Sequence, residues 1–157
     1  MKRVISLQVN GARQDVSVEP HHTLLDMLRE ELDLFSVREG CGLGMCGACT
    51  VLVDGKPMSS CLMLASLCEG KSLLTLEGLE SQGDLHPLQQ VYYEHTAFQC
   101  SFCTPGFILA TKALLDENPN PTPDEVRDYL AGNLCRCGSY VKIMEAVLDA
   151  AKRLTAT

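Results

Sequence analysis

Gly40-Cys41-Gly42-Leu43-Gly44-Met45-Cys46-Gly47-Ala48-Cys49 is the stretch that decides the fold of this 157-residue chain. Three cysteines and four glycines within ten residues make a regular helix or strand a poor prediction here. Glycine lets the backbone wrap closely and direct N–H groups at sulfur, which bulky residues would prevent. The stretch therefore predicts a loop shaped around a bound centre.

Eight of the nine cysteines fall into two sets of four. The first set has Cys-x4-Cys-x2-Cys spacing with a fourth cysteine after eleven residues, the pattern of plant-type [2Fe-2S] sites. The second set joins a Cys-x2-Cys pair to a Cys-x-Cys pair across thirty-one residues, which is a rarer arrangement. Four thiolates complete the coordination of two irons. We predict two [2Fe-2S] clusters, held by Cys41, Cys46, Cys49 and Cys61 and by Cys100, Cys103, Cys135 and Cys137.

Structural zinc is the main alternative, because four-cysteine sets also build zinc ribbons. It suits the second set better than the first, whose glycine-rich loop and longer spacing make a poor ribbon. Disulfides rank lower, since the cysteine count is odd and no secretory signal is apparent. Cys68 is left over in an apolar stretch and is predicted to be a core residue. The four histidines have no metal-ligand spacing and are expected at the surface or at helix caps.

The charge composition limits the kinds of partner that the chain can bind. A net charge of -7 and a pI near 5.0 argue against nucleic acid and against anionic membranes, since both require clustered Lys and Arg. No apolar stretch approaches a signal core or a membrane span. We therefore expect a cytoplasmic protein that binds neither nucleic acid nor membrane.

The first half of the chain has strand periodicity. Residues 4–9 and 14–18 alternate around Asn10-Gly11, and a second hairpin turns at Asp54-Gly55. Thr23 is expected to cap a helix over residues 24–32, and residues 73–76 supply a closing strand. Hairpin, helix, cysteine loop, hairpin and strand predict a small β-grasp, ferredoxin-like domain.

The second half changes to helical periodicity. Residues 87–96, 105–118, 123–131 and 140–154 are predicted as four helices, with Thr122 and Pro123 as a cap pair. The polar stretch 80–84 is the expected linker. The predicted class is therefore α+β: a ferredoxin-like [2Fe-2S] domain over residues 1–80, then an all-α four-helix-bundle [2Fe-2S] domain over residues 84–157. Both cysteine pairs of the second set should meet at one end of that bundle.

Three motifs resemble the iron–sulfur (small) subunit of the xanthine oxidase family of molybdenum hydroxylases. They are Gly40 to Val51, Gln99-Cys100-Ser101-Phe102-Cys103-Thr104-Pro105-Gly106, and Gly132-Asn133-Leu134-Cys135-Arg136-Cys137. The resemblance covers essentially the whole chain and includes the order of the two domains. It implies an electron-transfer subunit that passes electrons singly from a large molybdopterin-binding subunit to a medium FAD-binding subunit, in a dimer of heterotrimers. Water would supply the oxygen, and the catalytic residues would lie on another chain.

The same resemblance implies roles for single positions. The second cysteine set would hold the cluster nearer the molybdopterin and the first set the one nearer the flavin. Gln99 matches the glutamine that reaches the pterin, and Cys137 matches the ligand cysteine close to its amino group. Thr104 to Gly106 agrees with members that have a flavin partner, which favours FAD over a cytochrome acceptor.

Two departures from the family pattern stand beside the second set. Ser101 replaces a common glycine, and Gly138-Ser139-Tyr140 replaces Thr-Gly-Tyr. Both are expected to alter backbone freedom and hydrogen bonding at the inner cluster. The rival hypothesis is a free-standing two-cluster ferredoxin, but such a carrier has no need of a residue like Gln99. The resemblance leaves the substrate open, because the pocket that selects it lies on the large subunit.

Overall fold

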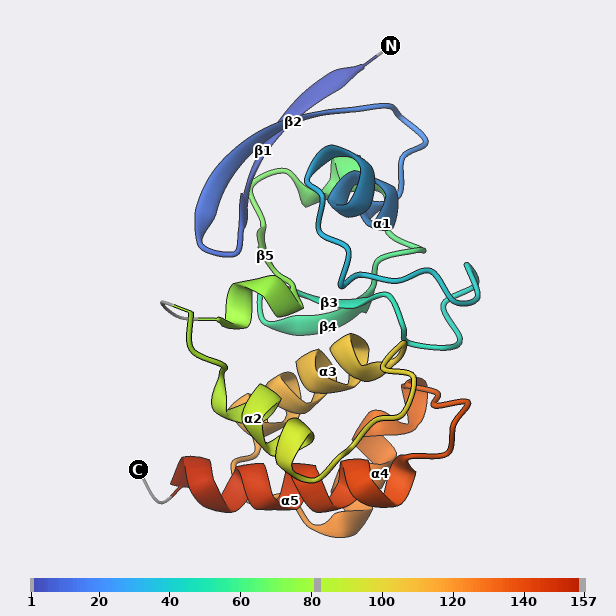
Figure 1. Ribbon diagram of the computed structural model, residues 1–157. Coiled ribbons are helices and arrows are strands. Elements are labelled where there is room, and N and C mark those ends of the chain that lie inside the picture. Colours follow the sequence, from blue (N-terminus) through green and yellow to red (C-terminus); the bar gives the residue numbers. More distant parts are fainter. Residues whose placement is uncertain (1, 81–82, 156–157) are drawn as a thin grey trace.

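A five-stranded sheet and a group of helices stack on one another in the computed structural model, which describes residues 2–80 and 83–155 (Figure 1). The predicted α+β class is confirmed. Residues 81 and 82 of the predicted linker lie outside the described residues. Within the described ranges, no helix combines the length and apolar character needed to cross a bilayer.

The sheet is mixed. Its strands are β1 (Arg3–Val9), β2 (Ala12–Val18), β3 (Thr50–Val53), β4 (Lys56–Ser59) and β5 (Ser72–Leu74), in the order β2-β1-β5-β3-β4. β1 pairs antiparallel with β2 and parallel with β5, whereas β3 pairs antiparallel with both β4 and β5. The central position of β5 joins the two hairpins into one sheet.

Both hairpins turn where the sequence predicted. Asn10 and Gly11 have φ values of 53° and 81°, and Asp54 and Gly55 have values of 50° and 80°. Two successive positive φ values define the turn whose twist matches a two-residue hairpin, and Asn-Gly or Asp-Gly adopts them at low cost. Asn10 also accepts a hydrogen bond from the backbone N–H of Thr75 at 2.9 Å. This bond draws the chain out of the sheet after Leu74, so β5 is shorter than the predicted strand.

The helix predicted over residues 24–32 is present but is not α-helical throughout. Thr23 caps it, and its side chain and that of Asp26 form a reciprocal capping box. The α-helical part, α1 (Leu24–Asp26), then widens into a π-helical turn, Met27–Glu31. Apolar spacing alone does not distinguish these two forms, because Met27 and Leu28 are buried in either one.

The four predicted helices of the second half are α2 (Pro87–Glu94), α3 (Thr104–Glu117), α4 (Pro123–Tyr129) and α5 (Tyr140–Thr155). α4 ends earlier than predicted, because the chain tightens into a 3-10 turn, Leu130–Gly132. Thr122 accepts a hydrogen bond from the N–H of Glu125, so it is the predicted N-cap. The beginning of α4 therefore follows from the predicted local signal.

β3 connects the two apolar cores. All four of its residues are buried, because α1 covers one face of the sheet and α3 lies beneath the other (Figure 1). Val51 and Val53 pack into the core below α1, whereas Leu52 joins the helical core with Phe107. Alternation along a strand sends neighbouring side chains to opposite faces, so this short strand fixes the two halves against each other.

Candidate metal centres

The first cysteine set lies on the loop that leads into β3. Gly42, Gly44 and Gly47 all have positive φ, between 65° and 73°, which only glycine adopts freely. The turns they make direct the N–H groups of Leu43 and Met45 at the sulfur of Cys41, each at 3.3 Å. Those two bonds, with the N–H of Cys46, lower the pKa of the Cys41 thiol to about 7. The loop therefore favours the thiolate form of Cys41.

The other two members of this set come from the edges of the second hairpin. Cys49 directly precedes β3 and is buried, and Cys61 follows β4. Burial raises the pKa of Cys61 to about 11, and its side-chain contact with Cys49 adds to the rise. Cys41 likewise contacts Cys46. The structure thus brings the four thiols together as two pairs.

The structure also brings the second set together, at the N-terminal ends of two helices. Cys100 and Cys103 precede α3, Cys135 and Cys137 precede α5, and the sulfurs of Cys100 and Cys137 are 3.5 Å apart. Burial, then contact with Cys135, raises the pKa of Cys103 to about 12. The N–H of Phe102, followed by Cys137, lowers the pKa of Cys100. This set too consists of two pairs, Cys100 with Cys137 and Cys103 with Cys135.

Pairs rather than foursomes are what a two-iron cluster requires. In the described part of the chain, no three His, Cys, Asp or Glu side chains converge on one point in the way that a single ion needs. A structural zinc ion would draw four ligands around one centre, whereas a [2Fe-2S] cluster takes two thiolates at each iron. The thiolate donors, their N–H partners and their pairing fit the cluster.

The two cysteine loops are adjacent. Both lie on the same side of the molecule, to the right in Figure 1, one above the other. The N–H of Leu134 donates to the carbonyl of Cys46 at 2.9 Å. The buried amide of Asn133 donates to the carbonyl of Gly47 at 3.0 Å, and that carbonyl also accepts from the hydroxyl of Thr50 at 2.7 Å. These contacts link the loop of the first set directly to the segment that leads into Cys135 of the second set.

Sequence reasoning missed the residues of this junction. Gly106 approaches the same carbonyl so closely that a Cβ added to it would lie 2.2 Å from the Gly47 oxygen. A Cβ added to Gly47 would lie 2.5 Å from the Asn133 amide nitrogen. The glycines and Asn133 were visible in the motifs, but no local pattern indicates that they touch. The two glycines could have been recognised only from the crowding around them, which is visible once the neighbouring segment is in place.

The two family departures have structural consequences. Ser101 has a φ of 62°, which explains why glycine is common at this position and means that serine adopts it under strain. Gly138 has a φ of 79°, so the chain makes a left-handed turn directly after Cys137. After that turn the N–H of Ser139 donates to the sulfur of Cys135 at 3.4 Å, and the Tyr140 hydroxyl accepts from the Cys135 N–H at 2.8 Å.

The remaining predicted residues lie as follows. The Gln99 amide donates to the carbonyl of Cys137 at 3.1 Å, so these two residues lie together beside the second set. Cys68 is fully buried in the sheet core, away from both loops, and burial raises the pKa of its thiol to about 11. His86 caps α2 and His95 bonds to Asp149 at 2.9 Å, which agrees with the capping and surface roles expected of histidine.

Comparison with known proteins assigns each half of the chain to a family. Residues 7–75 match the 2Fe-2S iron-sulfur cluster binding domain, and residues 75–148 match the [2Fe-2S] binding domain. The chain is 48% identical over 152 residues to the nicotinate dehydrogenase small FeS subunit of Eubacterium barkeri, covering 97% of each chain. This chain belongs to the iron–sulfur small subunits of the xanthine oxidase family. It is an electron-transfer subunit of a multi-subunit molybdenum hydroxylase, and its two domains are those that bind [2Fe-2S] clusters.

Other small subunits and solved structures agree. The nicotine 6-hydroxylase small subunit of Paenarthrobacter nicotinovorans is 49% identical over 146 residues, covering 93% of this chain and 88% of that one. Quinoline 2-oxidoreductase from Pseudomonas putida 86 matches with a TM-score of 0.91 and 44% identity, covering 97% of both chains. The aldehyde oxidoreductase of Desulfovibrio desulfuricans matches with a TM-score of 0.94 and 47% identity, covering 98% of this small subunit but 17% of that chain. The same fold is therefore a separate subunit in some enzymes and part of a longer chain in others.

Proposed function

We propose that each cysteine set holds one [2Fe-2S] cluster. The ligands are Cys41, Cys46, Cys49 and Cys61 in the first set and Cys100, Cys103, Cys135 and Cys137 in the second. When bound, the clusters would supply centres that take up and release one electron at a time. The chain's own residues hold the thiolates in pairs and direct N–H groups at their sulfurs, as Leu43 and Met45 do at Cys41. Such hydrogen bonds help to set the reduction potential.

One observation carries the proposal that electrons pass between the two centres through this chain. The carbonyl of Cys46, in the first set, accepts a hydrogen bond of 2.9 Å from the N–H of Leu134, the residue before Cys135. Covalent bonds and this single hydrogen bond thus connect a thiolate of one set to a thiolate of the other. The bond from Asn133 to Gly47, beside that connection, is buried.

We also propose that residues 1–80 form a β-grasp ferredoxin-like domain and residues 84–157 a four-helix bundle. Two separate clusters of buried side chains support this division. One lies between the sheet and α1, and the other lies among α2 to α5. Leu52 and Leu79 from the first half join the helical cluster, so the domains would share a packed boundary instead of a flexible one. The bundle would then present its cysteine end beside the first loop.

The partner subunits follow from the relatives. We propose a large molybdopterin-binding subunit and a medium FAD-binding subunit, assembled as a dimer of heterotrimers in the cytoplasm. Gln99 and Cys137 would face the pterin, which agrees with the bond between them, with the exposed position of Gln99 and with the half-buried position of Cys137. The first set would then lie toward the flavin.

The first substrate class to test is a nitrogen heteroaromatic ring. Two relatives with close to half of their residues identical are named for nicotinate and nicotine, and a structural match is named for quinoline. Aldehydes are the second class, because the aldehyde oxidoreductase of Desulfovibrio desulfuricans is also 47% identical. The pocket that chooses between them would lie on the large subunit.

Purification of the native complex through a tag on this chain tests the assembly. We expect bound molybdenum, FAD and two distinct electron paramagnetic resonance signals on partial reduction. A complex without flavin would overturn the FAD partner, and a chain that purifies alone with both signals reducible would favour a free-standing ferredoxin.

Gln99→Ala tests the pterin contact. It should keep both resonance signals, because no thiolate is removed, and slow their reduction by substrate, because the contact with the pterin and the bond to the Cys137 carbonyl are lost. Gln90→Ala is the matched control, since Gln90 is a glutamine of α2 whose amide bonds to Glu94 at 2.8 Å on an exposed surface. Equal kinetics in both variants would leave Gln99 a structural role.

A further inference from the structure

Arg38 joins the two cysteine loops. Its backbone N–H donates to the carbonyl of Ala48 at 3.3 Å, within the first loop. Its guanidinium donates to the carbonyl of Ser101 and lies 5.5 Å from the centroid of the Phe102 ring. Ser101 and Phe102 are the two residues between Cys100 and Cys103. One side chain that starts beside the first set therefore ends inside the second.

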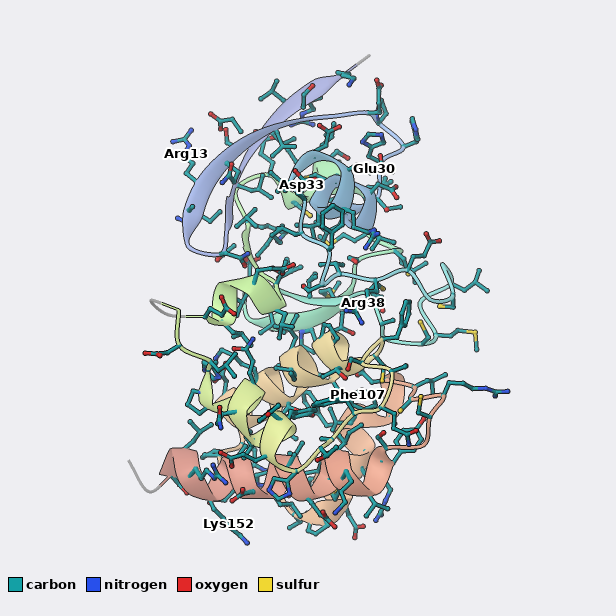
Figure 2. The ribbon with its side chains drawn as sticks, in the orientation of Figure 1. Arg13, Glu30, Asp33, Arg38, Phe107 and Lys152 are labelled. Carbon is teal, nitrogen blue, oxygen red and sulfur yellow. The ribbon has the colours of Figure 1, made fainter. Side chains whose placement is uncertain are left out.

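The surroundings fix the guanidinium in place. Figure 2 shows Arg38 at mid-height, level with β3 and above the helices of the second half. Phe102 lies against the start of the first loop, because a Cβ added to Gly40 would be 3.6 Å from its ring. Ser101 has a φ of 62°, in the left-handed region that residues other than glycine adopt under strain. The hydrogen bond from Arg38 to the Ser101 carbonyl stabilises this strained conformation. The same bond fixes the position of the guanidinium.

A fixed cation at this position affects redox chemistry. Arginine stays protonated at any physiological pH, and its half-buried position here lessens screening by water. Reduction of a thiolate-ligated centre adds one negative charge, so a nearby cation favours the reduced state. The guanidinium contacts the second loop, whereas only the backbone of Arg38 contacts the first. The favourable interaction is therefore larger at the second centre.

We propose that Arg38 is a positioning residue that raises the reduction potential of the second centre relative to the first. It thereby sets how one electron is shared between the two cysteine sets. This inference rests on the ligand assignment made above. The electron balance is that of the existing transfer, in which one electron enters the chain and one leaves it, so no further reactant is needed.

Arg29 provides an internal comparison. It also lies 5.5 Å from the centroid of an aromatic ring, Phe35, and also donates to a backbone carbonyl, that of Val37, at 2.8 Å. Both arginines line the same surface hollow of about 320 Å³. The partners of Arg29 belong to residues 35–37 and not to a cysteine loop. Removal of the Arg29 side chain therefore changes charge and packing to an extent similar to removal of Arg38, but it breaks no contact with the second set.

The test is a redox titration of the assembled complex, followed by the two resonance signals. Arg38→Met should shift the equilibrium sharing of an electron about tenfold toward the first centre, which corresponds to about 60 mV for a one-electron couple. Arg38→Gln removes the charge but keeps an N–H donor, so it should shift the ratio as Arg38→Met does. Arg38→Lys keeps the charge and should leave the ratio within about threefold of wild type.

Three results would overturn the inference. They are an unchanged ratio in Arg38→Gln or Arg38→Met, a tenfold shift in Arg38→Lys, and an equal shift in Arg29→Met. The second would assign the effect to hydrogen-bond geometry, and the third to general surface charge. A wild-type complex without two separate [2Fe-2S] signals would instead contradict the ligand assignment, so the two failures are distinguishable.

Discussion

Gly106→Ala would test how tightly the helical half is fixed to the first cysteine loop. Gly106 lies in the first turn of α3, and an added Cβ would stand 2.2 Å from the carbonyl oxygen of Gly47. Carbon and oxygen in nonbonded contact normally lie at least about 3.3 Å apart. Loop and helix would therefore have to separate by roughly 1 Å. Both atoms belong to or adjoin backbone, so no side-chain rotation relieves the overlap.

The cost can be bounded. Overpacking a filled site costs about 1–3 kcal/mol, whereas helix propensity favours alanine over glycine by up to ~1 kcal/mol. The movement also stretches the bonds that the Gly47 carbonyl accepts from Thr50 at 2.7 Å and Asn133 at 3.0 Å. We expect a net loss of about 1–2 kcal/mol in the free energy of unfolding, or roughly 2–8 °C in Tm for a chain of this size.

Thermal unfolding of the cluster-loaded complex, followed by circular dichroism, measures this loss. Gly132→Ala is the matched control, because an added Cβ there meets no atom within 4 Å and the residue has no positive φ. Magnetic coupling between the two resonance signals should weaken in Gly106→Ala and stay unchanged in Gly132→Ala. If Gly106→Ala were as stable as Gly132→Ala, the close packing of loop and helix would be refuted.

Three further predictions concern other parts of the chain. Cys137→Ser should abolish the resonance signal of the second centre, whereas Cys68→Ser should keep both signals, because Cys68 is fully buried in the sheet core; loss of a signal in the Cys68 variant would mean that the ligand assignment is wrong. Glu77 accepts hydrogen bonds from two hydroxyls, which outweigh burial and lower its pKa, so its contribution is present at neutral pH and is lost as pH falls through that lowered pKa. Glu77→Gln should accordingly lower stability by about 1 kcal/mol at pH 7 and match wild type in acid, as measured by urea unfolding at several pH values; an equal difference at all pH values would contradict this. Tyr92→Phe removes the buried bond of 2.8 Å to the Thr111 hydroxyl and should cost about 1–2 kcal/mol in urea unfolding, with no change in either signal; a neutral substitution would mean that water replaces the lost partner.

Local features were predicted well because their causes lie within a few residues. Asn10-Gly11 and Asp54-Gly55 make the predicted turns through their own φ preferences. Thr23 and Thr122 cap helices by bonding to an N–H three residues ahead. Apolar spacing does not report the two departures from prediction, the π-helical turn after Asp26 and the early end of β5. The second involves a bond from the N–H of Thr75 to Asn10, 65 positions away, which no local pattern indicates.

The two departures from the family pattern, at Ser101 and Gly138, were predicted only in part. The sequence indicated that Ser101 and Gly138 would alter the backbone beside the second set. The structure assigns positive φ to both, which strains Ser101 and is readily adopted by Gly138. A motif can mark such a position, but the conformation that makes the replacement costly is visible only in the folded chain.

The sequence by itself determined that this chain carries two four-cysteine sets, an α+β fold and the motifs of an iron–sulfur small subunit. Residue type, spacing and periodicity carry that information, and each acts over short distances along the chain. Only the tertiary structure decided which thiols pair, that Leu134 bonds to Cys46, and that Arg38 reaches Ser101 across 63 positions. Asn133 and Gly47 are 86 positions apart, and β3 with both faces buried is what brings them together. Contacts at such separations depend on how two cores pack, and no pattern along the chain encodes that packing directly.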